Sequence, residues 1–128
     1  MYATANLIAW QNANYYYYSG IFYQPYNGGY QAVAPPIGAV VPSLPSGTIT
    51  VYVGDDAYYY FSGTFFVPSS GGGYQIIAGP PGAIVYNLPD GCTSVNANGV
   101  TYLVYNGTYF QPIQDADGQN GYEVADVE

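Results

Sequence analysis

Acidic side chains are the first residues of this sequence that could do chemistry. Five of its eight Asp and Glu residues lie in the last fourteen positions, and residues 115–120 read Asp-Ala-Asp-Gly-Gln-Asn. This stretch has the form of part of an Asp-x-Asp-Gly calcium loop. Calcium takes six to eight oxygen ligands, and a glycine permits the sharp turn between them. The pattern predicts either a calcium site at Asp115, Asp117 and Asn120 or a solvated acidic loop.

Groups for acid–base or nucleophilic catalysis are scarce. The sequence contains no His, Lys or Arg, so it lacks an imidazole base, a Schiff-base lysine and a partner that could activate a serine or Cys92. A pair of carboxylates could hydrolyse glycosides, but Asp55, Asp56 and Asp90 occupy positions typical of Asp in turns. We therefore expect no enzymatic activity and no cofactor other than the calcium just described. As the single cysteine, Cys92 is expected to be a small core residue or to form an intermolecular disulfide.

The charge balance excludes several kinds of partner. The formal net charge is −8, so nothing in the chain could neutralise nucleic-acid phosphates or bind acidic lipid. No apolar run is long enough to span a membrane, and no signal peptide is visible. An inert, acidic extracellular chain would have this composition. A sequence read from a density map, in which long flexible cations fade, would also have it.

One sequon, Asn106-Gly107-Thr108, is present. It predicts either N-glycosylation of Asn106 or an ordinary Asn-Gly hairpin turn. Ser and Thr in turns could carry O-linked sugar instead, and no motif would reveal it.

The elements that must position these residues recur along the chain. Three segments of the form Tyr-x-x-x-x-Gly-x-aromatic-aromatic-x-Pro place glycines at 20, 63 and 107, a spacing of 43 and 44 residues. A second block occurs twice, as Pro-Pro-Ile-Gly-Ala-Val-Val at 35–41 and Pro-Pro-Gly-Ala-Ile-Val at 80–85. A match at so many positions indicates internal duplication of a unit of about 44 residues.

Each unit is predicted to consist of strands. Tyr, Phe, Val, Ile and Thr favour a pleated surface, and two-residue turns ending in Gly20, Gly63 and Gly107 predict hairpins with positive φ at those glycines. The turns place Tyr17 opposite Phe22, Tyr60 opposite Phe65 and Val104 opposite Tyr109. We therefore predict an all-β fold of tandem antiparallel meanders that form small barrels or sandwiches.

The repeats predict three modules, of which the first is incomplete. The ranges are 1–35, 36–79 and 80–128. Three meanders but only two Gly-Ala-x-Val strands are present, so one module lacks a strand. Small modules of this kind are marginally stable alone and must lean on each other or on other chains.

Aromatic residues predict a contact surface. The run Tyr15, Tyr16, Tyr17 and Tyr18 must place two rings on each face of its strand, and one face is then left to pack against something else. Exposed tyrosines either fill thin β modules or form amphipathic contacts between subunits. The terminal stretches, with Trp10 in one and Tyr122 and Val124 in the other, are the expected strand donors to a neighbouring subunit.

The unit resembles a tyrosine-rich tandem-repeat domain of unknown function from bacterial secreted and cell-envelope proteins. The resemblance rests on Tyr-Tyr-Tyr-x-x-Gly-x-Tyr-Tyr-x-Pro, Gly-Tyr-x-Val and Pro-Pro-x-Gly-Ala-x-Val, and covers residues 7–124. Members often carry arginine before the proline, where this chain has Gln24, Val67 and Gln111. The combination also looks like the protomer of an environmental extracellular fibril. The resemblance implies no activity.

Together these features predict a structural protein of the cell exterior. The expected function is that of a filament subunit that polymerises with itself, head to tail, through strand pairing and aromatic contacts. The alternative is a cell-envelope module that binds glycans by stacking sugars on exposed tyrosines.

Overall fold

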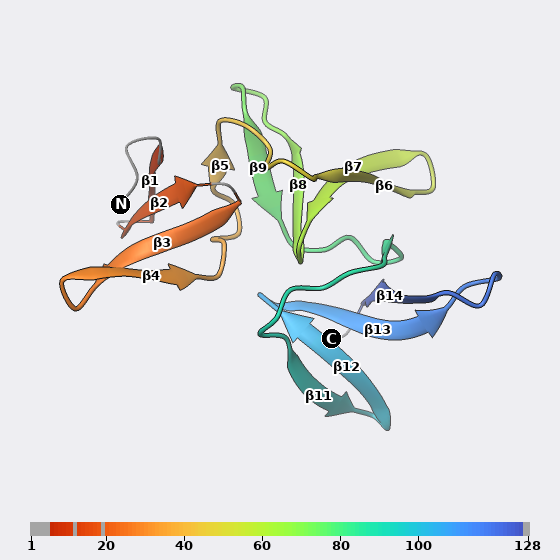
Figure 1. Cartoon of the computed structure of the whole chain (residues 1–128). Coiled ribbons are helices and arrows are strands. Elements are labelled where there is room, and N and C mark those ends of the chain that lie inside the picture. Colours follow the sequence, from red (N-terminus) through yellow and green to blue (C-terminus); the bar gives the residue numbers. More distant parts are fainter. Residues whose placement is uncertain (1–5, 12, 19, 127–128) are drawn as a thin grey trace. The chain divides into compact units, whose positions relative to one another are not determined.

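The chain is all-β, as the sequence predicts. A computed structural model describes residues 6–11, 13–18 and 20–126 (Figure 1). These residues form fourteen strands and no helix, and so the described part contains no helix that could cross a membrane. The strands are β1 Asn6–Trp10, β2 Ala13–Tyr18, β3 Ile21–Tyr26, β4 Gly29–Val33, β5 Val40–Val41, β6 Ile49–Val53, β7 Asp56–Phe61, β8 Thr64–Pro68, β9 Tyr74–Ile77, β10 Ile84–Val85, β11 Thr93–Ala97, β12 Val100–Tyr105, β13 Thr108–Gln114 and β14 Asn120–Ala125.

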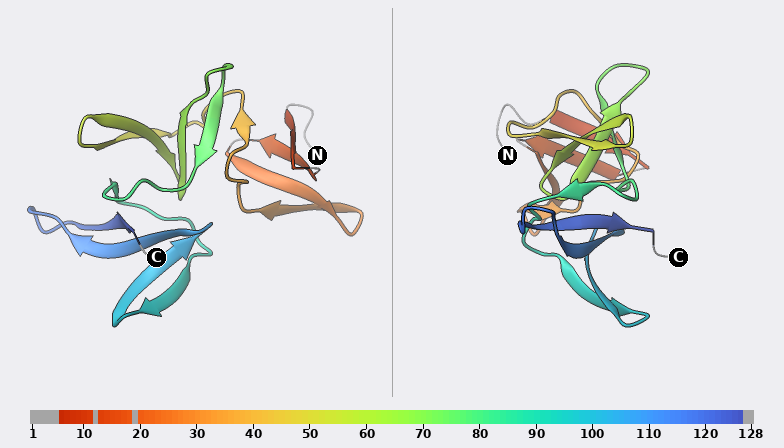
Figure 2. Two further views of the ribbon diagram at one scale, coloured as in Figure 1. Left: turned by 180° about the vertical axis from the view of Figure 1, so that it is seen from behind. Right: turned by 90° about the vertical axis from the view of Figure 1, so that its right-hand side faces the viewer.

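The strands form three sheets. Their orders are β1-β2-β3-β4, β5-β9-β8-β7-β6 and β10-β14-β13-β12-β11. Figure 2 shows the same strands from two further sides, with the β3–β4 hairpin in orange. The strands at the two ends of each order do not pair with each other in the described residues, so the expectation of small closed barrels is wrong. A strand of two residues, such as β5 or β10, is too short to complete a barrel wall.

The hairpin turns have the geometry that their residues require. Gly20, Gly63 and Gly107 have φ of 86°, 91° and 81°, as expected for these turns. The preceding Ser62 and Asn106 have φ of 43° and 51°. Two consecutive positive φ values define a type I′ turn, whose twist matches that of the flanking strands.

The strand register also agrees with the prediction. Tyr17 lies opposite Phe22, and Val104 lies opposite Tyr109. In the second meander the rings of Tyr60 and Phe65 are 4.9 Å apart between centroids. Such cross-strand aromatic pairs each contribute about 0.2–1 kcal/mol.

Two compact units divide the chain differently from the predicted modules. One unit comprises residues 1–48 and 66–77, and the other comprises 49–65 and 78–128. The strands of each sheet nevertheless fall within one of the ranges 1–35, 36–79 and 80–128, which remain a prediction. The largest fully buried side chains in the first unit are Phe22, Phe66, Ile76 and Val41, and those in the second are Tyr60, Phe65, Phe110 and Val85.

A tight turn precedes β5 and β10. Ala39 N–H donates to the Pro36 carbonyl, and Ala83 N–H donates to the Pro80 carbonyl, each at 3.2 Å. The intervening Gly38 and Gly82 have φ of 98° and 93°, as residue i+2 of a type II turn requires. The turn delivers the following Gly-Ala-x-Val segment to a sheet edge.

Candidate assembly interface

The described strands leave every sheet with two edges, and the first sheet differs from the other two because its fourth strand, β4, is one of them. β5 pairs with β9, and β10 pairs with β14, both antiparallel. The fourth strand of the first sheet, β4, pairs with β3 alone in the part of the chain that the structure describes. Figure 1 shows β4 as the outer strand of its sheet. An exposed strand edge of this kind is a template for pairing with another chain.

The pairing with β3 fixes which backbone groups of β4 point outward. The turn Asn27-Gly28 joins Tyr26 to Gly29, and the register then pairs Gln24 with Gln31. Hydrogen-bonded and non-hydrogen-bonded pairs alternate in an antiparallel ladder. The N–H and C=O groups of Tyr30 and Ala32 therefore point away from β3, towards the uncovered side.

Most side chains of β4 are exposed as well. Tyr30 is 45% exposed, and Gly29, Gln31 and Ala32 are likewise exposed. At the positions that correspond to Ala32, Ile76 is 0% exposed and Val124 is 3% exposed. β5 and β10 pair with β9 and β14 beside these residues, whereas no described strand pairs with β4 beside Ala32.

Of the predicted tyrosine run, one ring belongs to the core. Tyr17 is 3% exposed, packs against Phe22 at 4.9 Å between ring centroids, and donates its hydroxyl hydrogen to the Ser43 carbonyl at 3.3 Å. Burial raises the pKa of Tyr17 to about 12. Tyr17 thus stabilises the first unit.

The other three tyrosines of the run are half-buried. Tyr15 contacts Phe22 edge-on at 6.1 Å, and Tyr16 contacts Tyr30 of β4 edge-on at 5.5 Å. The Tyr16–Tyr30 pair places an aromatic surface beside the β4 edge. Large exposed tyrosines elsewhere are Tyr26, Tyr52 and Tyr86, which are 55%, 67% and 45% exposed.

The predicted donor stretches lie in paired strands. Trp10 ends β1, which pairs with β2, and its ring lies so close to Gly38 that a Cβ there would be 2.6 Å from Cζ2. Tyr122 and Val124 belong to β14, which lies between β13 and β10. β14 therefore already pairs with β10 within its own sheet. Residues 1–5 and 127–128 of the donor stretches lie outside the described residues.

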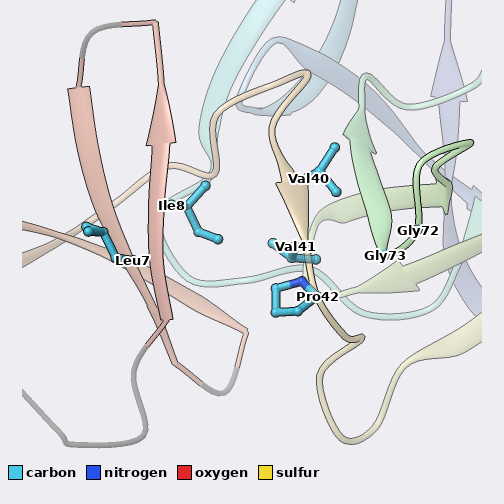
Figure 3. Close-up of a pocket in the computed structure, with 7 residues that line it drawn as sticks. All are labelled: Leu7, Ile8, Val40, Val41, Pro42, Gly72 and Gly73. Atoms are coloured by element: carbon cyan, nitrogen blue, oxygen red, sulfur yellow. The ribbon is translucent and has the colours of Figure 1, made fainter.

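An apolar groove lies in the first unit between β1 and β5. Leu7, Ile8, Val40, Val41 and Pro42 line it, together with Gly72 and Gly73. Figure 3 shows Ile8 on the side of β1 that faces β5. Because no charged side chain lines the groove, it suits an apolar side chain better than a polar ligand.

The predicted calcium loop is a hydrogen-bonded turn. Asp115 Oδ1 accepts from the backbone N–H of Asp117 and of Gln119 at 3.0 and 2.9 Å, and Oδ2 accepts from the Tyr86 hydroxyl at 3.2 Å. Asn120 begins β14 opposite Gln114. Within residues 6–11, 13–18 and 20–126, no three His, Cys, Asp or Glu side chains are grouped to hold a metal ion. The geometry accounts for Asp115 as a turn-forming residue, and calcium binding remains a prediction.

The sequon lies in the β12–β13 turn. Asn106 is half-buried, whereas Thr108 is 6% exposed and its Oγ1 accepts from the Gly79 N–H at 3.0 Å. The folded structure thus uses the sequon hydroxyl internally. Cys92 is half-buried, with its thiol directed to the Pro89 carbonyl at 3.3 Å. Burial, and then Asp90, raises the pKa of this thiol, which disfavours the reactive thiolate.

Comparison with known proteins places the chain in a family. A family of unknown function, DUF6515, matches residues 1–128. The chain belongs to this family. No curated protein and no solved structure matches the chain.

Sequence reasoning overlooked β4 as a site. Gly29, Tyr30 and Ala32 form its exposed edge, yet their residue types are ordinary for a strand. The signal that could have found them is the arrangement of blocks: a Gly-Ala-x-Val block precedes the second and third meanders but not the first.

Proposed function

We propose that the chain is a structural subunit of an extracellular filament, polymerising head to tail through β-strand pairing and aromatic contacts. The observation that carries the proposal is the strand deficit. The first sheet has four strands where each of the other two has five. No described strand pairs with the outward backbone groups of β4, and a strand of another polypeptide could supply their partners.

Strand addition suits a polymer because backbone hydrogen bonds supply affinity and side-chain positions set the register. The β4 edge is one surface, and its occupant comes from a different surface of the neighbour. Such a heterologous contact does not close into a dimer and generates rings or filaments. The pair formed by half-buried Tyr16 and exposed Tyr30 supplies aromatic area beside the edge. The proposal includes no catalysis, in keeping with the absence of His, Lys and Arg from the sequence.

Exposed tyrosines favour a second candidate function, a cell-envelope module that binds glycans. Tyr52, Tyr26 and Tyr86 are 67%, 55% and 45% exposed. Aromatic rings with one apolar face and a polar tip can stack on sugars while keeping the hydroxyl in water. The first proposal includes covalent glycans on the filament, at Asn106 or at turn Ser and Thr residues.

Negative-stain electron microscopy of the purified protein, combined with electrophoresis through polysaccharide gels, tests the two candidates. A filament subunit gives long, uniform fibres. A glycan-binding module gives single particles whose migration is retarded by the polysaccharide. Single particles at all concentrations with retarded migration would refute the filament proposal in favour of the second.

A further inference from the structure

In the second and third sheets, a Gly-Ala-x-Val segment covers the edge that corresponds to β4 in the first sheet. In the second sheet, Gly38 N–H donates to the Ile76 carbonyl at 2.8 Å, and Ile76 N–H donates to the Ala39 carbonyl at 2.9 Å. In the third sheet, Gly82 N–H donates to the Val124 carbonyl at 2.9 Å, and Val124 N–H donates to the Ala83 carbonyl at 2.8 Å. One occupant, the Gly-Ala segment, thus makes the same pair of bonds at both sites.

The covering segment also contributes to the core. Ala39, Val41, Ala83 and Val85 are each 0% exposed. The residues between them, Val40 and Ile84, are 38% and 37% exposed. An occupant therefore needs a small residue and a valine on its inner face and tolerates a variable residue between them.

Three equivalent glycines show where an occupant would approach. A Cβ on Gly73 would lie 2.5 Å from the Val41 carbonyl oxygen, and one on Gly121 would lie 3.2 Å from the Val85 carbonyl oxygen. The covering strand comes close to both glycines, and Gly73 also has a φ of 74°, which itself favours glycine. A Cβ on Gly29 would meet only the Tyr26 carbonyl oxygen, at an ordinary 3.8 Å. Within the described residues, the first sheet has a glycine at the position of Gly121, likewise without a positive φ, but no covering strand beside it.

This inference rests on the proposed function: we infer that the β4 edge binds a Pro-x-Gly-Ala-hydrophobic-Val strand of a second copy of this chain, which that copy releases from its own β9 or β14 edge. The register follows from the two internal sites, where Val40 lies opposite Gln75 and Val41 opposite Tyr74. The hydrophobic residue of the incoming strand lies opposite Gln31 and its valine opposite Tyr30. The incoming Gly N–H donates to the Ala32 carbonyl, and the Ala32 N–H donates to the incoming Ala carbonyl.

Because the covering segments in this chain have a known sequence, a peptide with that sequence can be used to test the β4 edge. A synthetic peptide of residues 80–86, Pro-Pro-Gly-Ala-Ile-Val-Tyr, is titrated into the full chain while the backbone amide resonances of Tyr30 and Ala32 are followed by NMR. We expect saturable shifts at these two amides. Methylation of the peptide's Gly nitrogen removes one of the two hydrogen bonds and should weaken binding about tenfold, the equivalent of about 1.4 kcal/mol.

A glycine substitution supplies the matched variants. Gly29→Val should leave the fold intact, because a Cβ there meets no atom closer than 3.8 Å, and should abolish peptide binding and polymerisation. Gly71→Val is the control, because a Cβ there meets nothing within 4 Å and the residue lies outside β4. Circular dichroism and thermal melting of both variants establish that they are folded.

These experiments distinguish a failure of the inference from a failure of the proposed function. Wild-type filaments that ignore the peptide and persist unchanged in Gly29→Val would overturn the inference and leave the filament proposal standing. Peptide binding that Gly29→Val abolishes, in a wild-type protein that never polymerises, would support the inference and refute the filament proposal.

Discussion

At the scale of single residues, Gly63 is the most constrained hairpin glycine of the second unit. Its φ is 91°, and a Cβ there would lie 2.7 Å from Tyr105 Cδ2 and 2.8 Å from Pro89 Cδ. Gly63→Val should therefore destabilise the fold by more than about 1 kcal/mol, through backbone strain and crowding together. Chemical denaturation measures the free energy of unfolding.

Gly107→Val separates the two causes of that loss. Gly107 occupies the same turn position with φ of 81°, and a Cβ there would meet nothing within 4 Å. It should carry the backbone cost alone. If Gly63→Val costs no more than Gly107→Val, the crowding against Tyr105 and Pro89 is not present in solution.

Two buried tyrosines give the protein an alkaline limit. Burial raises the pKa of Tyr17 and of Tyr60 to about 12 from 10.0. Because the unfolded chain ionises these groups near pH 10 while the folded chain holds them neutral, stability is unaffected below pH 10. It falls between pH 10 and 12, by at most about 1 kcal/mol per pH unit for each tyrosine.

Thermal melting across this pH range checks the effect, with Tyr60→Phe as the comparison. The substitution deletes the hydrogen bond from the Tyr60 hydroxyl to the Asn87 carbonyl and should lower stability at neutral pH by about 1 kcal/mol. It should also flatten the alkaline slope. An unchanged slope would mean that Tyr60 does not titrate late.

At the scale of elements, one side-chain hydrogen bond ties β13 to the segment before β10. The Gly79 N–H donates to Thr108 Oγ1, and Thr108 is buried. Thr108→Val keeps the shape but leaves the N–H without its acceptor, at an expected cost of about 1–3 kcal/mol. Thr101→Val makes the same change at an exposed position of β12 and should alter stability by less than about 0.5 kcal/mol. Equal unfolding free energies for the two variants would show that the bond contributes nothing.

The elements also show how far the sequence could predict the fold. Hairpins were predictable because their information is local: Asn106 and Gly107 fix a turn, and the turn fixes the register of Val104 with Tyr109. The partners of β5 and β10 were not predictable. A two-residue strand has no periodicity, and Val40 pairs with Gln75, 35 residues away. Each Gly-Ala-x-Val block stands between two meanders and could have paired with either.

That ambiguity is also why the candidate site escaped prediction. The sequence showed that one strand was missing, but only the pairing of each block with the meander after it identifies β4 as the strand left uncovered. Among the interface residues chosen for aromatic character, Tyr17 is buried in the core, since ring size alone does not distinguish a packed face from an exposed one.

At the scale of the whole molecule, we propose that subunits join at the β4 edge. Hydrogen exchange tests it residue by residue in assembled and unassembled protein. The amides of Gln31 and Val33 point towards β3 and should be protected in both states, which provides an internal control. The amides of Tyr30 and Ala32 point outward; they should exchange rapidly in the single subunit and become protected on assembly. Filaments in which Tyr30 and Ala32 exchange as fast as in the unassembled chain would contradict the account.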